Sequence, residues 1–139
     1  MSTLTGLSTT AIQSDRAGTA RRYAGDWGHI VLLKGAFTVV ASPDGTVYHI
    51  PVASPALARA GSGDVLTGLI AGLLAQGVTP FPAAITAAWV HATAGLIAEQ
   101  QFGQSASVLA GDILRATPQA ITRLYAQDEI HDPLWIVKA

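Results

Sequence analysis

A glycine-rich turn that leads directly into an apolar helix constrains this chain more than any other feature. The run Ala60-Gly61-Ser62-Gly63-Asp64 precedes leucine, isoleucine and valine residues that recur every three or four positions, a spacing typical of a helix. We predict this helix over residues 64–76, with Gly77 at its end. Residues without bulky side chains let successive amide N–H groups converge, and the helix dipole adds positive potential. Gly61, Ser62 and Gly63 are therefore predicted to form an anion hole.

The predicted helix also contains glycines in its interior. Gly68 and Gly72 each cost roughly 1 kcal/mol relative to alanine in an exposed helix. The residues on the opposite side are leucine, isoleucine and valine. We therefore expect this helix to be buried nearly all round, with another backbone close to its glycines.

Asp64, at the start of this helix, supports two interpretations. A carboxylate in the first turn interacts favourably with the helix dipole, by about 0.3–1 kcal/mol. Beside an anion hole, the same carboxylate can instead take a proton from a hydroxyl that attacks a phosphoryl group. The residues alone leave both interpretations open, and the turn lacks the lysine of a Walker A loop.

Three short strands are predicted to precede the turn. Residues 29–34 form an apolar run between two glycines, and residues 37–41 and 46–50 flank a Ser-Pro-Asp-Gly sequence. Pro-Asp-Gly is strong turn chemistry, so the second and third strands are expected to form a hairpin. A single helix is predicted over residues 9–27, before the strands.

The rest of the chain is predicted to be largely helical. Residues 51–60 contain two prolines and no clear periodicity, which indicates a loop. Proline and cap signals predict three further helices, at residues 80–101, 108–115 and 118–127. The tail at 128–139 is either an added strand at 134–137 or an end that diverges from related proteins.

Two other residues were considered for the site. Lys34 ends the first predicted strand, where the ligands of open α/β sheets gather, so it can reach a phosphate, although a solvated lysine is the alternative. His91 lies among small apolar residues of a predicted helix and is expected to be structural. The four histidines show no metal-ligand spacing, so no protein metal site is predicted.

Composition excludes several classes of function. Half of the residues are hydrophobic, 12% are charged and the formal net charge is −1, so the basic patches that bind nucleic acid are not expected. The longest apolar stretch identified, Val65 to Ala75, is shorter than the ~20 residues of a membrane span. The chain has no cysteine, which is compatible with a reducing compartment. We expect a cytoplasmic protein that binds neither nucleic acid nor membrane.

Several of these motifs together resemble one enzyme family. The stretch from Val31 to Thr38, reading VLLKGAFT, and the stretch from Ala60 to Gly77, reading AGSGDVLTGLIAGLLAQG, closely resemble ADP- or ATP-dependent NAD(P)H-hydrate dehydratases. The similarity extends to Asp15-Arg16, to His91-Ala92-Thr93-Ala94-Gly95 and to Ala110-Gly111-Asp112-Ile113-Leu114. It implies an α/β fold that forms the C-terminal part of a ribokinase-like three-layer αβα domain, covering residues 1–127.

The resemblance also implies a reaction and the residues that perform it. The family repairs hydrated NADH or NADPH by phosphorylating the added hydroxyl with a nucleotide and then eliminating it. By similarity, the adenine nucleotide contacts Gly63 and the loop residues Lys34, Gly35, Ala36, Phe37 and Thr38. Asp64 would contact the hydrate and act as the base. The amides of the anion hole would hold the transferred phosphoryl group, and Mg²⁺ would neutralise phosphate charge.

The family's kinase-like domain is longer than this chain. Its N-terminal half supplies parallel strands and further hydrate-binding residues, which leads us to expect a split or truncated form. A homo-oligomer or a partner chain would then supply the missing half, and the apolar composition fits such an interface. The alternatives are a nucleotide-binding module without catalysis and a kinase of a small alcohol of the hydroxymethylpyrimidine or hydroxyethylthiazole type. The Lys-Gly-x-x-Thr pattern favours the dehydratase.

Overall fold

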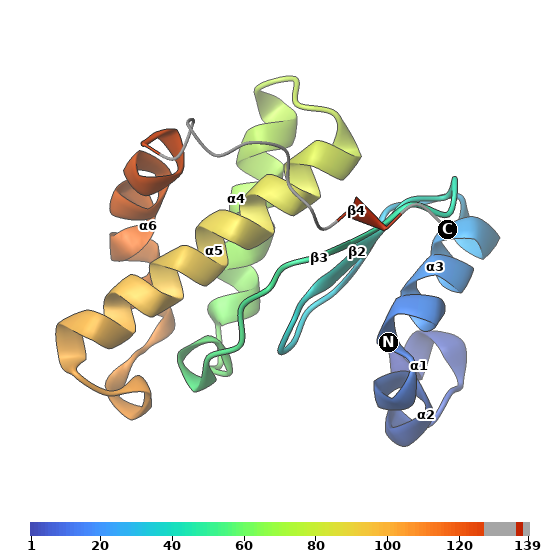
Figure 1. Ribbon diagram of the computed structural model, residues 1–139, viewed down its shortest axis with the longest axis horizontal. Helices are drawn as coiled ribbons and strands as arrows, with labels where there is room; N and C mark the ends of the chain where they lie inside the picture. Colours follow the sequence, from blue (N-terminus) through green and yellow to red (C-terminus); the bar gives the residue numbers. More distant parts are fainter. Residues whose placement is uncertain (127–135, 138–139) are drawn as a thin grey trace.

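The computed structural model describes residues 1–126 and 136–137, and it has a central sheet with helices on both sides. One group of helices covers one face of the sheet and a second group covers the other (Figure 1). The predicted α/β three-layer arrangement is therefore confirmed. The first group comprises α1 (Ser2–Thr5), α2 (Thr9–Ser14) and α3 (Arg16–Trp27), and the second comprises α4 (Ser62–Ala75), α5 (Pro80–Phe102) and α6 (Ala110–Tyr125).

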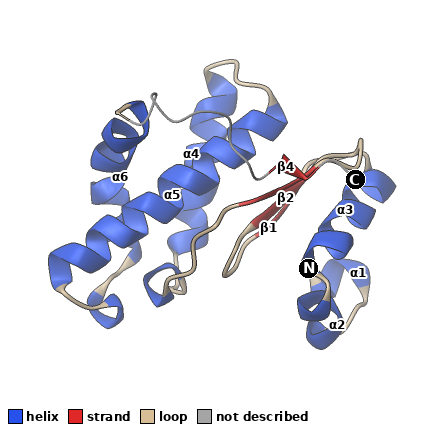
Figure 2. Ribbon diagram, viewed as in Figure 1, coloured by secondary structure: helices blue, strands red, loops and turns tan. Residues whose placement is uncertain are grey.

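The sheet has its strands in chain order, and all pairings between described residues are antiparallel. The predicted hairpin is confirmed, because its turn is closed by a bond from the Ser42 amide to the Thr46 carbonyl at 2.9 Å. Asp44 Oδ1 also accepts from the Thr46 amide at 2.9 Å. The strands, shown in red in Figure 2, are β1 (Val31–Leu33), β2 (Val39–Ala41), β3 (Val47–His49) and β4 (Ile136–Val137).

Both faces of this sheet are covered, which accounts for much of the apolar composition. Alternate residues of a strand point to opposite faces. Val39 and Ala41 of β2 pack in a cluster with α3, whereas Val40 packs with Tyr48 in a cluster that includes residues of α4 and α5. All three residues of β2 are consequently buried.

The prediction of one helix over residues 9–27 is wrong in one respect. The segment forms two helices that meet at Asp15, whose backbone (φ −145°, ψ 78°) is not helical. The Asp15 carboxylate accepts the Gly18 amide at 2.8 Å and so caps α3. A side-chain cap that competes with the helical backbone is the physical reason for the break.

Helix α4 is less buried than its sequence predicted. It begins at Ser62, earlier than expected, and its leucine, isoleucine and valine face packs inward. Gly68 and Gly72 lie on an exposed face, and a Cβ atom built on either would meet nothing within 4 Å. The expected close approach of another backbone is therefore not made by the described part of this chain.

Helix α5 is the central helix of the second group. It packs against α4, α6 and β2, and against the short 3₁₀ helix η1 (Pro55–Leu57), which lies in the segment predicted as a loop. At 23 residues, α5 is a longer apolar stretch than the sequence reading identified, and by length and composition alone it could cross a bilayer. However, 61% of its most apolar window is buried within the structure, as in the core helix of a globular domain.

Helix α6 replaces the two helices predicted around Pro118, and that prediction is wrong. Pro118 lies inside the helix and is exposed. The residue four positions earlier, Leu114, is also exposed, so water can bond the carbonyl that proline leaves without a donor. A second 3₁₀ helix, η2 (Ser105–Ser107), precedes α6.

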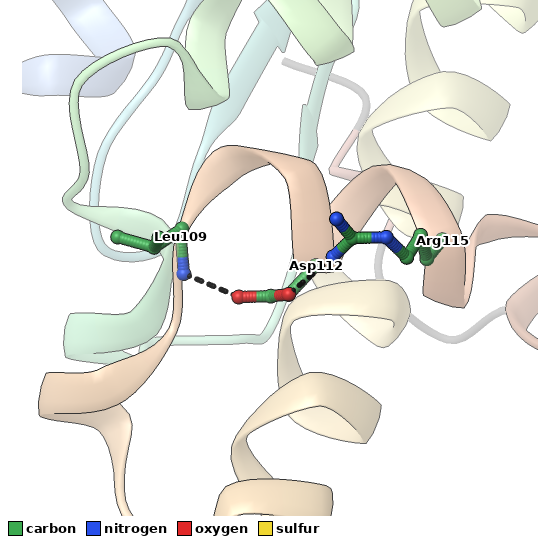
Figure 3. Close-up of polar contacts among 3 residues, drawn as sticks. All are labelled: Leu109, Asp112 and Arg115. Atoms are coloured by element: carbon green, nitrogen blue, oxygen red, sulfur yellow. Dashed lines mark hydrogen bonds and ion pairs between the residues drawn. The ribbon is translucent and has the colours of Figure 1, made fainter.

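The first turn of α6 is stabilised by an acidic side chain (Figure 3). Asp112 Oδ2 accepts the Leu109 backbone amide at 2.9 Å, and Asp112 Oδ1 accepts from Arg115 at 2.6 Å. Satisfying a first-turn amide in this way stabilises a helix. Asp112 is the third residue of α6, just as Asp64 is the third residue of α4.

The C-terminal tail contains the short strand β4, whose Val137 pairs with Val47 and whose Ile136 pairs with Tyr48. The strand alternative for the tail is thus supported at these two residues. Residues 134 and 135, and the predicted boundary between 127 and 128, lie outside the described residues.

Two glycine substitutions should have opposite effects on stability. Gly68→Ala should raise the free energy of unfolding by up to about 1 kcal/mol, because the site is helical and open. Gly95→Ala should lower it by about 1–3 kcal/mol, because the new Cβ would collide with the Leu57 side chain in the core. Urea denaturation of both variants tests the pair, and equal effects would contradict the packing described.

Candidate functional site

The loop after β1 is a tight turn held by its own side chains. The Gly35 amide donates to Thr38 Oγ1 at 3.2 Å, and that hydroxyl donates back to the Gly35 carbonyl at 3.0 Å. The Phe37 amide donates to the Val52 carbonyl at 3.0 Å. Phe37 has a φ of 52°, which is uncommon for a residue other than glycine, and its side chain is 55% exposed. Residues Lys34–Thr38 therefore project a shaped loop from the end of the strand.

Gly35 lies against an arginine from α3. The Arg16 guanidinium donates to the Leu33 carbonyl at 2.7 Å, and burial lowers the pKa of Arg16. A Cβ on Gly35 would lie 2.8 Å from Arg16 Nη2, so a side chain here would displace the guanidinium. The arginine thus packs directly against the loop. This contact joins Arg16 to the loop that begins at Lys34, two segments that the sequence related only through the family resemblance.

Lys34 points inward, toward the second group of helices. Its ammonium donates to the Leu57 carbonyl at 2.8 Å, and burial lowers the pKa of Lys34 below its usual value. The interpretation of Lys34 as a solvated strand-end lysine is therefore not supported. A half-buried cation at the end of a strand is suited to meet an anionic ligand.

The predicted anion hole lies at the start of α4. Gly61 has a φ of 81°, which favours glycine, and a Cβ there would approach Ala110 Cβ to 3.2 Å. Backbone conformation and packing therefore both favour glycine at this position. The Ser62 amide donates to the Arg59 carbonyl at 3.1 Å. Within the described residues, the amides of Gly61 and Gly63 donate to no protein group. Gly63 is exposed, and a Cβ there would meet nothing within 4 Å, so a ligand has space to approach this residue.

The Leu57 carbonyl joins the loop and the anion hole. It accepts from Lys34 Nζ, as described above, and also from Ser62 Oγ at 2.8 Å. Leu57 ends η1, whose cap residue Ser54 donates to Glu99 of α5 at 2.6 Å. One backbone oxygen, held through η1 to the core helix, therefore sets the position of both parts of the site.

His91 of α5 contacts the turn at Ser62 from the interior of the protein. Its side chain is 3% exposed, and Nε2 lies 2.9 Å from the Ser62 carbonyl. Because a carbonyl can only accept, Nε2 carries the proton in this bond. Burial and the nearby Lys34 charge lower the pKa of His91 to about 4, although the bond to Ser62 opposes the shift. The histidine is neutral at pH 7, and the expected structural histidine is what the structure shows.

A cavity of about 350 Å³ lies between the loop and α5. Lys34, Gly35, Ala36 and Thr38 contribute to its wall, which brings together four of the five residues predicted in the loop. Phe37, Gly63 and Asp64 are not part of the wall. The rest of the lining is mostly apolar, which suits a planar base or another weakly polar group. It comes from η1 and the residue after it, from α4 and α5, and from the loop between β3 and η1.

Asp64 is exposed, unlike the acid at the matching position of α6. In the described part of the chain, the Asp64 carboxylate has no hydrogen bond or ion pair, whereas Asp112 bonds both Leu109 and Arg115. A helix-start acid that caps nothing in its own helix is available to a ligand. Because the favourable interaction with the helix dipole needs no hydrogen bond, the geometry is compatible with both interpretations of Asp64.

Two features of the site could not be predicted from the sequence: the shared Leu57 carbonyl and the bond from His91 to Ser62. The Leu57 carbonyl has no sequence signature, because any residue presents one. The bond from His91 to Ser62 spans 29 residues, and the sequence signalled only that His91 lay on an apolar helix. Among the described residues, no group of three His, Cys, Asp or Glu side chains could hold a metal ion.

Comparison with known proteins identifies related sequences over most of the chain. A family model described as NAD(P)H-hydrate dehydratase matches residues 1–119. A bifunctional NAD(P)H-hydrate repair enzyme of Moorella thermoacetica is 47% identical over 129 residues, which is 93% of this chain and 24% of that protein. An ADP-dependent (S)-NAD(P)H-hydrate dehydratase of Neisseria meningitidis is 43% identical over 113 residues, covering 81% of this chain and 38% of that protein.

A solved structure shows the same fold. The ADP/ATP-dependent NAD(P)H-hydrate dehydratase of Bacillus subtilis, co-crystallised with ATP and Mg²⁺ and soaked with CoA, superposes with a TM-score of 0.78 at 32% sequence identity. The match covers 86% of this chain and 44% of that one. The chain thus spans less than half the length of each of these relatives.

The lowered pKa of His91 predicts a loss of stability in acid. The unfolded chain binds a proton at His91 near the ordinary pKa of 6.5, whereas the folded chain does so only near 4. Stability from this group is therefore complete above about pH 6.5 and is lost as the pH falls toward 4, by up to about 3 kcal/mol. Urea unfolding of the wild type and of His91→Gln across this range should show a shallower pH slope in the variant. Identical slopes would assign the titration to other groups.

Proposed function

Because this chain belongs to the NAD(P)H-hydrate dehydratase family, we propose that it supplies the nucleotide half-site of an ADP- or ATP-dependent NAD(P)H-hydrate dehydratase. The observation that carries this proposal is the Leu57 carbonyl, which Lys34 and Ser62 share at 2.8 Å each. This one acceptor therefore holds two parts of the site together: the loop, which suits an adenine nucleotide, and the turn, which suits its phosphates. The adjoining cavity of about 350 Å³ offers space for part of the nucleotide.

The proposed chemistry uses the groups that surround the turn. The hydroxyl of the hydrated nicotinamide ring attacks the terminal phosphoryl group of ADP or ATP, and Asp64 accepts the hydroxyl proton. The open amides of Gly61 and Gly63 receive the transferred phosphoryl group. The phosphorylated ring then loses inorganic phosphate and a proton from the adjacent carbon, which restores the ring double bond. The products are NADH or NADPH, phosphate, and AMP or ADP.

Mg²⁺ fits this proposal as an ion held mainly by the nucleotide. It commonly keeps several waters and binds through substrate phosphates and one or two carboxylates. The exposed Asp64 carboxylate stands beside the turn and is the acidic group of α4's first turn. The described residues contain no three-ligand cluster, so the phosphates and water would provide the remaining ligands. When bound, the ion would neutralise phosphate charge.

The hydrate-binding part of the site is proposed to come from outside this chain. The match covers less than half of each of these relatives, and α4 presents an exposed face of small residues to which another part of a domain can pack closely. We propose that the remaining half is supplied by a partner chain, by a second copy or by the rest of a longer chain. A cytoplasmic location is proposed, since the cysteine-free sequence suits a reducing compartment.

Asp64→Asn should abolish dehydration while leaving nucleotide binding within about threefold of the wild type. The amide keeps the shape of the side chain but cannot accept the proton. The assay follows the recovery of NADH absorbance from hydrated NADH, with ADP, Mg²⁺ and the remaining half of the domain supplied in trans.

Asp112→Asn is the matched control, because Asp112 occupies the same position in α6 but caps its own helix. It should keep the activity and lose some stability, by about 0.5–1 kcal/mol. Full activity in Asp64→Asn would reject its role as the base. If an active wild-type complex formed phosphorylated pyrimidine or thiazole alcohols instead of NADH, the small-alcohol kinase would replace the dehydratase.

Lys34→Met should raise the dissociation constant for ADP by about 10- to 100-fold, as expected for the loss of one charge-assisted contact. Isothermal titration calorimetry measures this change. Arg22→Ala is the control, since Arg22 of α3 forms an exposed pair with Asp26 at 3.5 Å, and α3 covers the face of the sheet opposite α4 and α5 (Figure 1). The ADP affinity of this variant should match that of the wild type. An ADP affinity that is unaffected by Lys34→Met would remove the lysine from the nucleotide site. Binding without turnover in the complete complex would indicate a nucleotide-binding module.

A further inference from the structure

The first turn of α4 is held from inside the protein by a single side chain. His91 donates its Nε2 proton to the Ser62 carbonyl at 2.9 Å. Both residues are almost fully buried, at 3% and 1% exposure. A buried hydrogen bond of this kind is costly to break, because the carbonyl and the ring nitrogen would each lose a partner without gaining water.

Ser62 is held at three points, and these points determine where its neighbours face. Its hydroxyl donates to the Leu57 carbonyl, its amide donates to the Arg59 carbonyl, and its own carbonyl accepts from His91. The residues on either side, Gly61 and Gly63, are exposed glycines whose amides have no partner in the described part of the chain. Without the anchored serine between them, two glycines leave the backbone free to adopt many conformations.

The anchor originates in a largely buried helix. α5 is the central helix of its layer, and Ala87, Ala88, Ala92 and Ala94 around His91 are buried. The same helix carries Glu99, which accepts from Ser54 and so holds η1. Because η1 presents the Leu57 carbonyl, α5 determines the position of the acceptor that Lys34 and Ser62 share. Through His91, it also determines the position of the Ser62 carbonyl.

We propose that His91 is a positioning residue of the nucleotide site, which holds the Ser62 carbonyl so that the Gly61 and Gly63 amides are aimed at the phosphoryl group. It does not contact the reacting atoms. Its effect on nucleotide binding rests on the function proposed above, whereas its effect on the turn does not. The neutral ring suits this task, since a charged imidazolium beside Lys34 would repel the lysine.

Amide hydrogen exchange tests the effect on the turn without any nucleotide. His91→Leu removes the donor at similar size, whereas His91→Gln keeps a side-chain N–H group. In His91→Leu, we expect the hydrogen-bonded amides of residues 64–66 to exchange at least about tenfold faster, as for the loss of one hydrogen bond. The matching amides of residues 112–114, in the first turn of α6, should change much less. His91→Gln should restore much of the protection. Equal acceleration at both helix starts would show a merely structural histidine and would overturn the proposal.

The consequence for binding is measured by calorimetry with ADP. We expect His91→Leu to weaken binding by about tenfold and His91→Gln by less than threefold. Ser62→Ala removes the hydroxyl that donates to the Leu57 carbonyl and should also weaken ADP binding. This second variant tests the proposal if His91→Leu fails to fold. Wild-type affinity in both Ser62→Ala and His91→Leu would overturn the proposal. Absence of ADP binding by the wild type would reject the proposed nucleotide function, whereas the exchange result would still decide whether His91 holds the turn.

Discussion

The burial of α5 is the constraint on which the rest of this structure depends. The helix packs against α4, α6, η1 and the β2 strand, and its alanines and glycine allow these elements to approach closely. At Gly95 the space is taken by the Leu57 side chain, so the packing of α5 determines where η1 lies. Apolar burial on this scale is the main favourable contribution to folding. The loops of the site, which contain few apolar residues, derive their order from their attachment to this helix.

The site illustrates how a small number of polar bonds can shape flexible segments. Glycine-rich turns lose much conformational entropy when they become ordered. Here that cost is offset by bonds to buried carbonyls: Leu57 accepts from Lys34 and Ser62, and Ser62 accepts from His91. The groups left over, two glycine amides and an exposed carboxylate, are the ones that the proposed chemistry uses. Lys34 adds positive charge at the adjoining cavity, where a phosphate-bearing ligand would be drawn in.

The surfaces that remain open fit the relationship with longer proteins. β1 lies at one edge of the sheet, and beyond its first turn, where Asp64 is the one charged residue of the helix, α4 exposes glycine and alanine. Natural proteins commonly protect sheet edges and avoid extended uncharged faces unless another element covers them. The Bacillus subtilis enzyme shares the fold at a TM-score of 0.78 over 44% of its length. The structure of that enzyme therefore extends beyond the part that this chain matches.

The sequence by itself determined the order of the elements, the hairpin and the glycine turn before α4, because these follow from local periodicity and turn chemistry. The family resemblance predicts that the loop at Lys34 belongs to the nucleotide site. Only the tertiary structure decided that Asp15 divides the first helix, that Pro118 is tolerated within α6, and that Gly68 faces outward. The break at Asp15 comes from a side-chain cap that competes with the helical backbone, whereas the other two depend on which groups can reach water. The same is true of the site's internal support, since the Leu57 carbonyl and the His91 bond join residues that are far apart in the chain and only folding brings them together.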